Sequence, residues 1–131
     1  MRYMMMVKAD PNSESGREYE DGAPPNPKLM EAIGKYAQEM FKAGLLLDTG
    51  GLLPSSKGAR IRAVRGKLSV MDGPFVETKE LIGGYGILQA DSREEAVEMG
   101  RAFMQLHVDV LGPSYQGELE IREMADPPDQ S

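Results

Sequence analysis

Two amphipathic helix patterns, each lying between strand patterns, constrain the fold of this chain more than any other feature. The first begins with Asn26 as N-cap and Pro27 at the first helical position, and Gly44 provides a left-handed stop. The second opens with Ser92 and Glu95, which have the spacing of a capping box. Apolar residues recur every three or four positions in both. The sequence therefore predicts two helices separated by strands.

Four segments read as strands of one sheet. Residues 2–8 form an apolar run in which both faces are apolar, which is typical of a central strand covered on both sides. Residues 45–53 and 85–90 are predicted as two further strands, each with a glycine pair inside it or just before it. Residues 118–124 alternate apolar and charged side chains, as at the edge of a sheet.

A hairpin is predicted between the two halves of the chain. Residues 60–65 and 67–71 are short β runs around a turn at Arg65-Gly66. The order is then β-α-β, hairpin, β-α-β, which predicts a ferredoxin-like α+β fold with an antiparallel sheet. Two helices cover only one face of such a sheet. The doubly apolar first strand therefore predicts a homodimer in which two sheets face each other.

The length of 131 residues fits one domain, which we expect to span residues 1–124. Residues 10–26 carry five acids, three prolines and two glycines, and predict a long mobile loop. That loop is either a flap over a site or a solvated insertion. Residues 125–131 are predicted to form a flexible tail.

Composition excludes several kinds of site. The chain has no cysteine, which excludes disulfides, zinc–thiolate sites and iron–sulfur clusters, and its single histidine leaves the common histidine-rich metal sites without ligands. No metal and no cofactor is expected. The apolar run at the N-terminus is too short for a signal peptide or a membrane span, so we expect a cytoplasmic protein without a membrane partner.

The predicted hairpin region is basic, although the whole chain has a net charge of −6. Its cations are Lys57, Arg60, Arg62, Arg65 and Lys67. No aromatic residues alternate with them, so a base-stacking surface is poorly supported and no nucleic-acid partner is expected. Solubility and protection of exposed strands explain the charges better.

The four-residue motif Asp72-Gly73-Pro74-Phe75 is one of several motifs that occur in a fixed order along the chain. With it come the segments 1–8, 44–53, 54–60, 77–80 and 118–122. On these motifs the chain resembles the YCII-related family, in its DGPF-containing group. The resemblance implies a ferredoxin-like fold that dimerises into an α/β-barrel-like assembly. It assigns no reaction to the chain, because the DGPF-containing group largely lacks an assigned reaction. Some relatives are proposed to use a His–Asp pair near the start of the chain, where this sequence has no histidine. The resemblance also implies a link to extracytoplasmic-function sigma factors.

Four charged residues are candidate ligand-binding residues at the predicted dimer cleft. Asp72 either accepts the amide hydrogens that follow it in an Asx-type turn, or also directs its carboxylate into the cleft. Glu77 and Lys79 form either a solvated link or the polar rim of a pocket, in which Lys79 binds an anion or pairs with Asp72. Lys8 ends the first strand, where it is either exposed or beside the pocket.

His107 is the side chain whose unperturbed pKa lies near neutrality. It is either a structural residue at the end of the second helix, or a proton carrier together with Asp72. Three functions follow from these alternatives. The first is a binding module for a small polar or anionic ligand, the second an enzyme of acid–base or elimination chemistry, and the third a regulatory partner of a sigma factor through residues 10–26.

Overall fold

The computed structural model describes residues 1–9, 13–75 and 81–125. Its main sheet has four strands in the order β2-β5-β1-β6, with every neighbouring pair antiparallel. The strands are β1 (Arg2–Ala9), β2 (Leu46–Gly51), β5 (Leu81–Gln89) and β6 (Glu118–Glu123). This mixed α+β architecture is compatible with the predicted ferredoxin-like fold, and β1 occupies the predicted central position.

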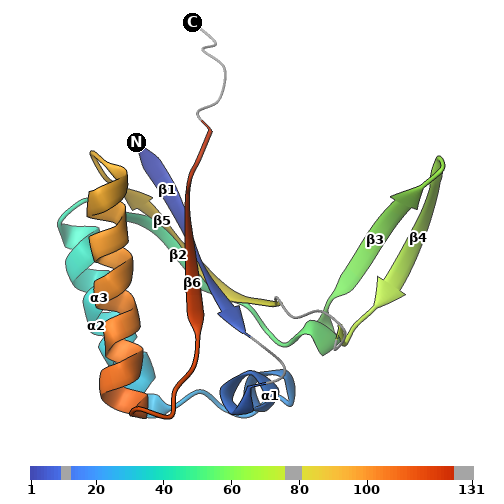
Figure 1. The fold of residues 1–131 in the computed structure, drawn as a ribbon, viewed down its shortest axis with the longest axis horizontal. Coiled ribbons are helices and arrows are strands. Elements are labelled where there is room, and N and C mark those ends of the chain that lie inside the picture. Colours follow the sequence, from blue (N-terminus) through green and yellow to red (C-terminus); the bar gives the residue numbers. More distant parts are fainter. Residues whose placement is uncertain (10–12, 76–80, 126–131) are drawn as a thin grey trace, which may run out of the picture.

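Two long helices, α2 (Pro27–Lys42) and α3 (Arg93–Leu111), pack on one face of this sheet (Figure 1). The Asn26 side chain caps α2 by accepting the amide hydrogens of Lys28 and Leu29, at 2.9 and 3.2 Å. After the helix, Gly44 has a φ of 73°, the left-handed conformation that glycine tolerates best. Both predicted ends of the first helix are therefore confirmed.

The capping box at the start of α3 is also confirmed, with one difference. The Ser92 hydroxyl accepts the amide hydrogen of Glu95 at 3.2 Å. The carboxylate of Glu95 accepts in return from the amide of Asp91, at 2.8 Å, rather than from that of Ser92. The first bond satisfies an amide that the first turn of a helix leaves without a partner, and the second fixes the residue that precedes the N-cap.

The core lies between the helices and the sheet. Helix α2 contributes partly buried side chains such as Ile33 and Met40. The fully buried residues come from the sheet, from the residue that follows β5 and from α3, and are Tyr3, Met5, Leu46, Leu88, Ala90, Ala96, Met99 and Phe103. Strand alternation turns Tyr3 and Met5 towards the helices, and it turns Met4 and Met6 to the opposite face. That opposite face has no helix over it in Figure 1.

The predicted hairpin forms a separate two-stranded sheet, which we call the arm. It consists of β3 (Ala59–Val64) and β4 (Lys67–Asp72), and it projects away from the helices and the main sheet (Figure 1). Arg65 and Gly66 have φ values of 52° and 79°, so both residues of the tight turn are left-handed. The short 3₁₀ helix η1 (Ser55–Lys57) leads into the arm.

Two predictions from the sequence need correction. The irregular loop expected over residues 10–26 is wrong for part of that range, because α1 (Glu14–Glu20) forms there with Ser13 as its N-cap. The strand expected to begin at Tyr85 begins instead at Leu81, because the residues before the Gly83-Gly84 pair also hydrogen-bond to β1.

Candidate functional site

An apolar patch covers the side of the main sheet that faces away from the helices. Strand register places Met4 beside Ile87 and Met6 beside Tyr85. All four side chains are partly exposed, and we call this patch the open face. Methionine side chains adapt their shape to what they contact, so this surface can accept apolar groups of different outline.

Charged residues of β1 and β6 form one border of the open face. The ammonium of Lys8 lies 3.0 Å from Oε1 of Glu120 and 3.9 Å from Oε1 of Glu118. Arg122 lies 3.8 Å from the other oxygen of Glu120. The hydrogen bond from Lys8 and its charge hold the pKa of Glu120 below its ordinary value, with a smaller contribution from Arg122. Glu120 is thus ionised at neutral pH and opposes the charge of Lys8.

Tyr85 and Asp48 form the opposite border, beside β2. The Tyr85 hydroxyl makes a long hydrogen bond of 3.5 Å to Oδ2 of Asp48. Its ring lies directly over Gly50, where a Cβ atom would come within 2.9 Å of Cε1 of the tyrosine. Only glycine leaves the ring in this position. The open face is therefore an apolar floor between two polar borders.

Asp72 ends β4, opposite Ala59, and its side chain is exposed. The predicted Asx-type turn is wrong, because the amides that follow Asp72 donate elsewhere. The Gly73 amide donates to the carbonyl of Gly58 at 3.0 Å, and the Phe75 amide to the hydroxyl of Ser55 at 3.0 Å. The chain of η1 passes so close to this turn that a Cβ on Gly73 would come within 1.8 Å of the Ser55 carbonyl oxygen. Backbone packing, not the Asp72 carboxylate, fixes the turn.

A second polar cluster, which we call the junction, joins α1 to the base of the arm. Its members are Glu20, Ser55 and Phe75. The Ser55 amide donates to Oε1 of Glu20 at 3.0 Å, and the Ser55 hydroxyl donates to Oε2 of the same carboxylate. The guanidinium of Arg60 stacks 4.0 Å above the centre of the Phe75 ring. Every polar atom named here has a partner inside the chain, so the junction serves to hold the arm.

Tyr19 strengthens the same connection. Its hydroxyl donates to the carbonyl groups of Leu52 and Leu53, the latter at 3.1 Å. Neither Tyr19 nor Glu20 was identified as functional from the sequence, because both lie in the acidic segment that was predicted to be irregular. Their helical spacing after Ser13, an N-cap residue type, was the signal available.

His107 is a buried residue at the C-terminal end of α3, only 6% exposed. Its Nδ1 atom donates to the carbonyl of Phe103 at 3.0 Å, and its ring stacks on Tyr115 with centroids 5.3 Å apart. Burial lowers the pKa of His107, and the hydrogen bond to Phe103 opposes that effect to a smaller extent. No interaction joins it to Asp72 in the described part of the chain. The geometry agrees with a structural role.

A family model for the YCII-related domain matches residues 1–105. The chain belongs to the YCII-related family. It is also 31% identical, over 98 residues, to an uncharacterized protein of Rhizobium meliloti (strain 1021); the matched region covers 75% of this chain and 74% of that protein.

The region that matches the YCII-related family model contains most of the strands and side-chain clusters described above. It includes β1, β2, β5, the arm and the junction, and it ends within α3. Glu118 and Glu120 lie beyond it, so the matched region contains Lys8 without its partners in β6. Among the other predicted ligand-binding residues, Glu77 and Lys79 lie outside the described residues, and Asp72 lies on a different sheet from Lys8.

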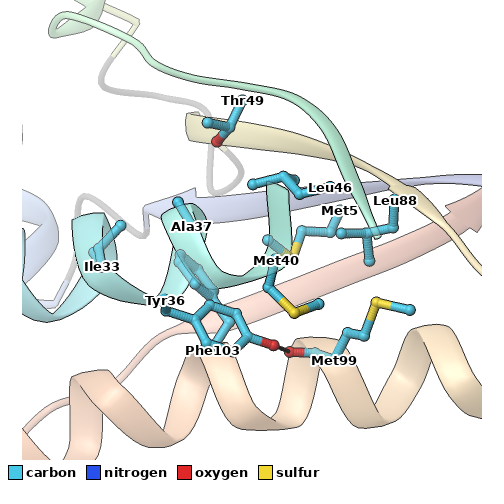
Figure 2. Close-up of a pocket in the computed structure, with 10 residues that line it drawn as sticks. All are labelled: Met5, Ile33, Tyr36, Ala37, Met40, Leu46, Thr49, Leu88, Met99 and Phe103. Carbon is cyan, nitrogen blue, oxygen red and sulfur yellow. Dashed lines mark hydrogen bonds between the residues drawn. The ribbon is translucent and has the colours of Figure 1, made fainter. Parts of the chain in front are cut away.

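A cavity of about 20 Å³ lies between α2, α3 and the helix-facing side of the sheet. Figure 2 shows the residues that line it. Apolar residues such as Met5, Met40 and Phe103 dominate its lining. The Tyr36 hydroxyl at its edge donates to the carbonyl of Met99 at 2.9 Å. A space of this size holds about one water molecule. We regard it as a gap in core packing.

Within residues 1–9, 13–75 and 81–125, no three acidic or histidine side chains are grouped as ligands for a metal ion. In the same part of the chain no helix combines the length and the apolar character that a membrane crossing requires.

Proposed function

We propose that this YCII-related protein is a homodimeric binding module of the DGPF-containing group that acts in the cytoplasm. It holds a small polar or anionic ligand in a cleft between the open faces of two copies. The observation that carries this proposal is the open face itself, an apolar floor without helical cover and with charged groups along its border.

The dimer follows from the two faces of β1. Tyr3 and Met5 point to the buried face of β1, and Met4 and Met6 point to the other face. Figure 1 shows α2 and α3 on one side of the sheet and no helix of the described residues over the other side. Two-fold symmetry pairs a surface with itself, so one apolar patch meets an identical patch of the second copy. Packed sheets lie about 10 Å apart, which leaves space for a small ligand where the facing side chains are short or displaced.

Lys8 supplies the polar recognition. Its contact with Glu120 is short, but its contact with Glu118 is long at 3.9 Å, and the Glu118 side chain is largely exposed. A ligand carboxylate can replace Glu118 beside the ammonium while Glu120 stays in place. The apolar part of the ligand then lies on Met4 and Met6, and the favoured ligand is a small acid with an apolar body.

Methyl NMR with carbon-13 in the methionine methyl groups tests this proposal. Benzoate and benzyl alcohol have the same ring and differ in charge, so they serve as paired probes. Benzoate should shift the signals of Met4 and Met6 more than benzyl alcohol does, and leave Met104 unchanged. Lys8→Gln should remove the preference for benzoate, whereas Lys35→Gln, a control on the exposed side of α2, should retain it. Unshifted Met4 and Met6 signals with millimolar concentrations of both probes would contradict the proposal.

A further inference from the structure

The arm has one apolar face and one basic face. In the β3–β4 register Ile61 lies opposite Val70, and Ala63 lies opposite Leu68. Alternation places these four side chains on the same side of the ribbon, which we call the apolar face of the arm. Arg60, Arg62 and Lys67 lie on the other side.

The apolar face of the arm is open to solvent in the single chain. Ile61 is 70% exposed, Leu68 75% and Val70 67%. The arm pairs with no strand of the main sheet within the described residues, and Figure 1 shows it extending away from them. A two-stranded ribbon is marginally stable in water by itself, and contiguous exposed apolar residues mark interaction surfaces.

The base of the arm is firmly attached to the rest of the chain, although its two strands are exposed to solvent. Ser55 bonds both to Glu20 of α1 and to the amide of Phe75, and Arg60 stacks on the Phe75 ring. These contacts fix the direction in which the arm leaves the molecule. An extended and anchored apolar strip is suited to packing on another protein surface.

The distribution of charge along the chain indicates which protein surface the arm contacts. Residues 55–71 contain five cations and no acid, and the whole chain has a net charge of −6, so the rest of the chain carries −11. We propose that the apolar face of the arm packs on the acidic body of a second copy of this chain. The proposal deepens the homodimer of the proposed function and rests on it, but it uses different residues from the open face.

Two other occupants fit the arm less well. Packing one arm directly on the other would bring together two segments with five cations each, and like charges oppose such contact. A nucleic acid would bind the basic face through its phosphates and leave Ile61, Leu68 and Val70 in water. An acidic second copy covers the apolar face, and its net negative charge attracts the cations at longer range, although they lie on the other side of the ribbon.

Sedimentation equilibrium of matched double variants tests the proposal. Ile61→Ser with Val70→Ser should raise the dimer dissociation constant about a hundredfold, because two large apolar side chains lose their cover. Arg62→Ser with Lys67→Ser, the control on the basic face, should raise it less than about tenfold. Circular dichroism should show an unchanged body in both variants, because the arm is a separate sheet.

A third variant separates this proposal from the proposed function. Met4→Ser with Met6→Ser alters the open face and leaves the arm intact. If only this variant dissociates, the arm proposal is overturned and the sheet-facing dimer stands. If only the Ile61 and Val70 variant dissociates, the arm proposal stands and the sheet-facing dimer does not. A wild-type protein that stays monomeric at roughly 100 µM overturns both.

Isotope-filtered NOE spectra of mixed labelled and unlabelled protein locate the contact. The methyl groups of Ile61, Leu68 and Val70 in one copy should contact residues outside 59–72 in the other copy. Contacts confined to the two arms would overturn the proposal. DNA binding to the arm of the wild-type protein, detected with a fluorescein-labelled strand, with no contact from Ile61, Leu68 or Val70 to a second copy, would overturn it as well.

Discussion

The ammonium of Lys8, near the end of the central strand β1, lies 3.0 Å from Oε1 of Glu120 on the edge strand β6. This pair links the open face to the one part of the sheet that lies beyond the family match. It lowers the pKa of Glu120, so its stabilising effect is present above the ordinary pKa of a glutamate. The effect is lost as the pH falls through the lower pKa of the folded state.

Replacing Lys8 should therefore raise the pKa of Glu120. Lys8→Met removes the hydrogen bond and the charge that lower it most, and Arg122→Met removes only the weaker contribution at 3.8 Å. The titration of the Glu120 carboxyl carbon, followed by carbon-13 NMR, should move to higher pH by more in the first variant. Equal shifts in both variants, or none, would show that Lys8 does not control this carboxylate.

Stability should fall when the pH drops below the ordinary pKa of histidine. Burial lowers the pKa of His107 below its ordinary value of 6.5, so the unfolded chain binds a proton more readily than the folded one. The neutral, buried form of His107 contributes its full share to stability above pH 6.5. This contribution decreases as the pH falls from 6.5 towards the lower pKa of the folded state. The free energy of unfolding, measured in urea, should show this decrease.

The pH effect can be assigned because His107 is the single histidine of the chain. His107→Phe keeps an aromatic ring beside Phe103 and Tyr115 and removes the titrating group. In this variant the free energy of unfolding should change less between about pH 5 and the ordinary histidine pKa of 6.5. An unchanged slope would place the titrating group elsewhere.

The junction should contribute measurably to stability. Ser55→Ala removes a donor to Glu20 and the acceptor of the Phe75 amide, and should lower the free energy of unfolding by about 1–3 kcal/mol. Ser56→Ala and Asp72→Ala, two controls at exposed positions, should each change it by less than about 0.5 kcal/mol. If Asp72→Ala proved the most damaging of the three, the Asp72 side chain would hold the turn after all.

A side chain at Gly100 should disturb the packing of α3 against β6. A Cβ atom there would come within 2.5 Å of Cδ1 of Ile121 and 2.9 Å of Cδ2 of Leu119, so Gly100→Ala should destabilise the fold by about 1–3 kcal/mol. Gly34→Ala is the matched control, since nothing lies within 4 Å of its added atom. It should stabilise the protein by up to about 1 kcal/mol. The free energy of unfolding, measured by heat or urea, should therefore fall in the Gly100 variant and rise in the Gly34 variant.

Local signals in the sequence predicted most of the fold. Asn26 and Gly44 bound one helix and Ser92 begins the other, because a cap is decided by residues within one turn of it. The hairpin turn at Arg65-Gly66 is equally local. Helix α1 was missed although Ser13 is a local N-cap signal, because the segment is acidic and rich in proline and glycine, and because the contacts of Tyr19 and Glu20 that attach it lie far along the chain.

The candidate site was less predictable, for the same physical reason. The apolar open face follows from the alternation of residues in β1, and Lys8 was correctly placed at the end of that strand. Its partner Glu120 was not predicted, because the pair exists only once β6 lies beside β1. Asp72 was selected from its local turn, but the amides of that turn bond to Ser55 and Gly58, which lie earlier in the chain.

The accessibility of the open face in solution tests most directly whether two copies pack through their open faces. A soluble gadolinium chelate broadens the methyl signals of methionines that it can approach. Met30 is an exposed reference on α2, and Met99 is a buried reference in the core. If two open faces pack together, Met4 and Met6 are protected like Met99 in concentrated protein, and their broadening rises towards that of Met30 on dilution. Met4 and Met6 signals that broaden to the same extent at every protein concentration would contradict such packing.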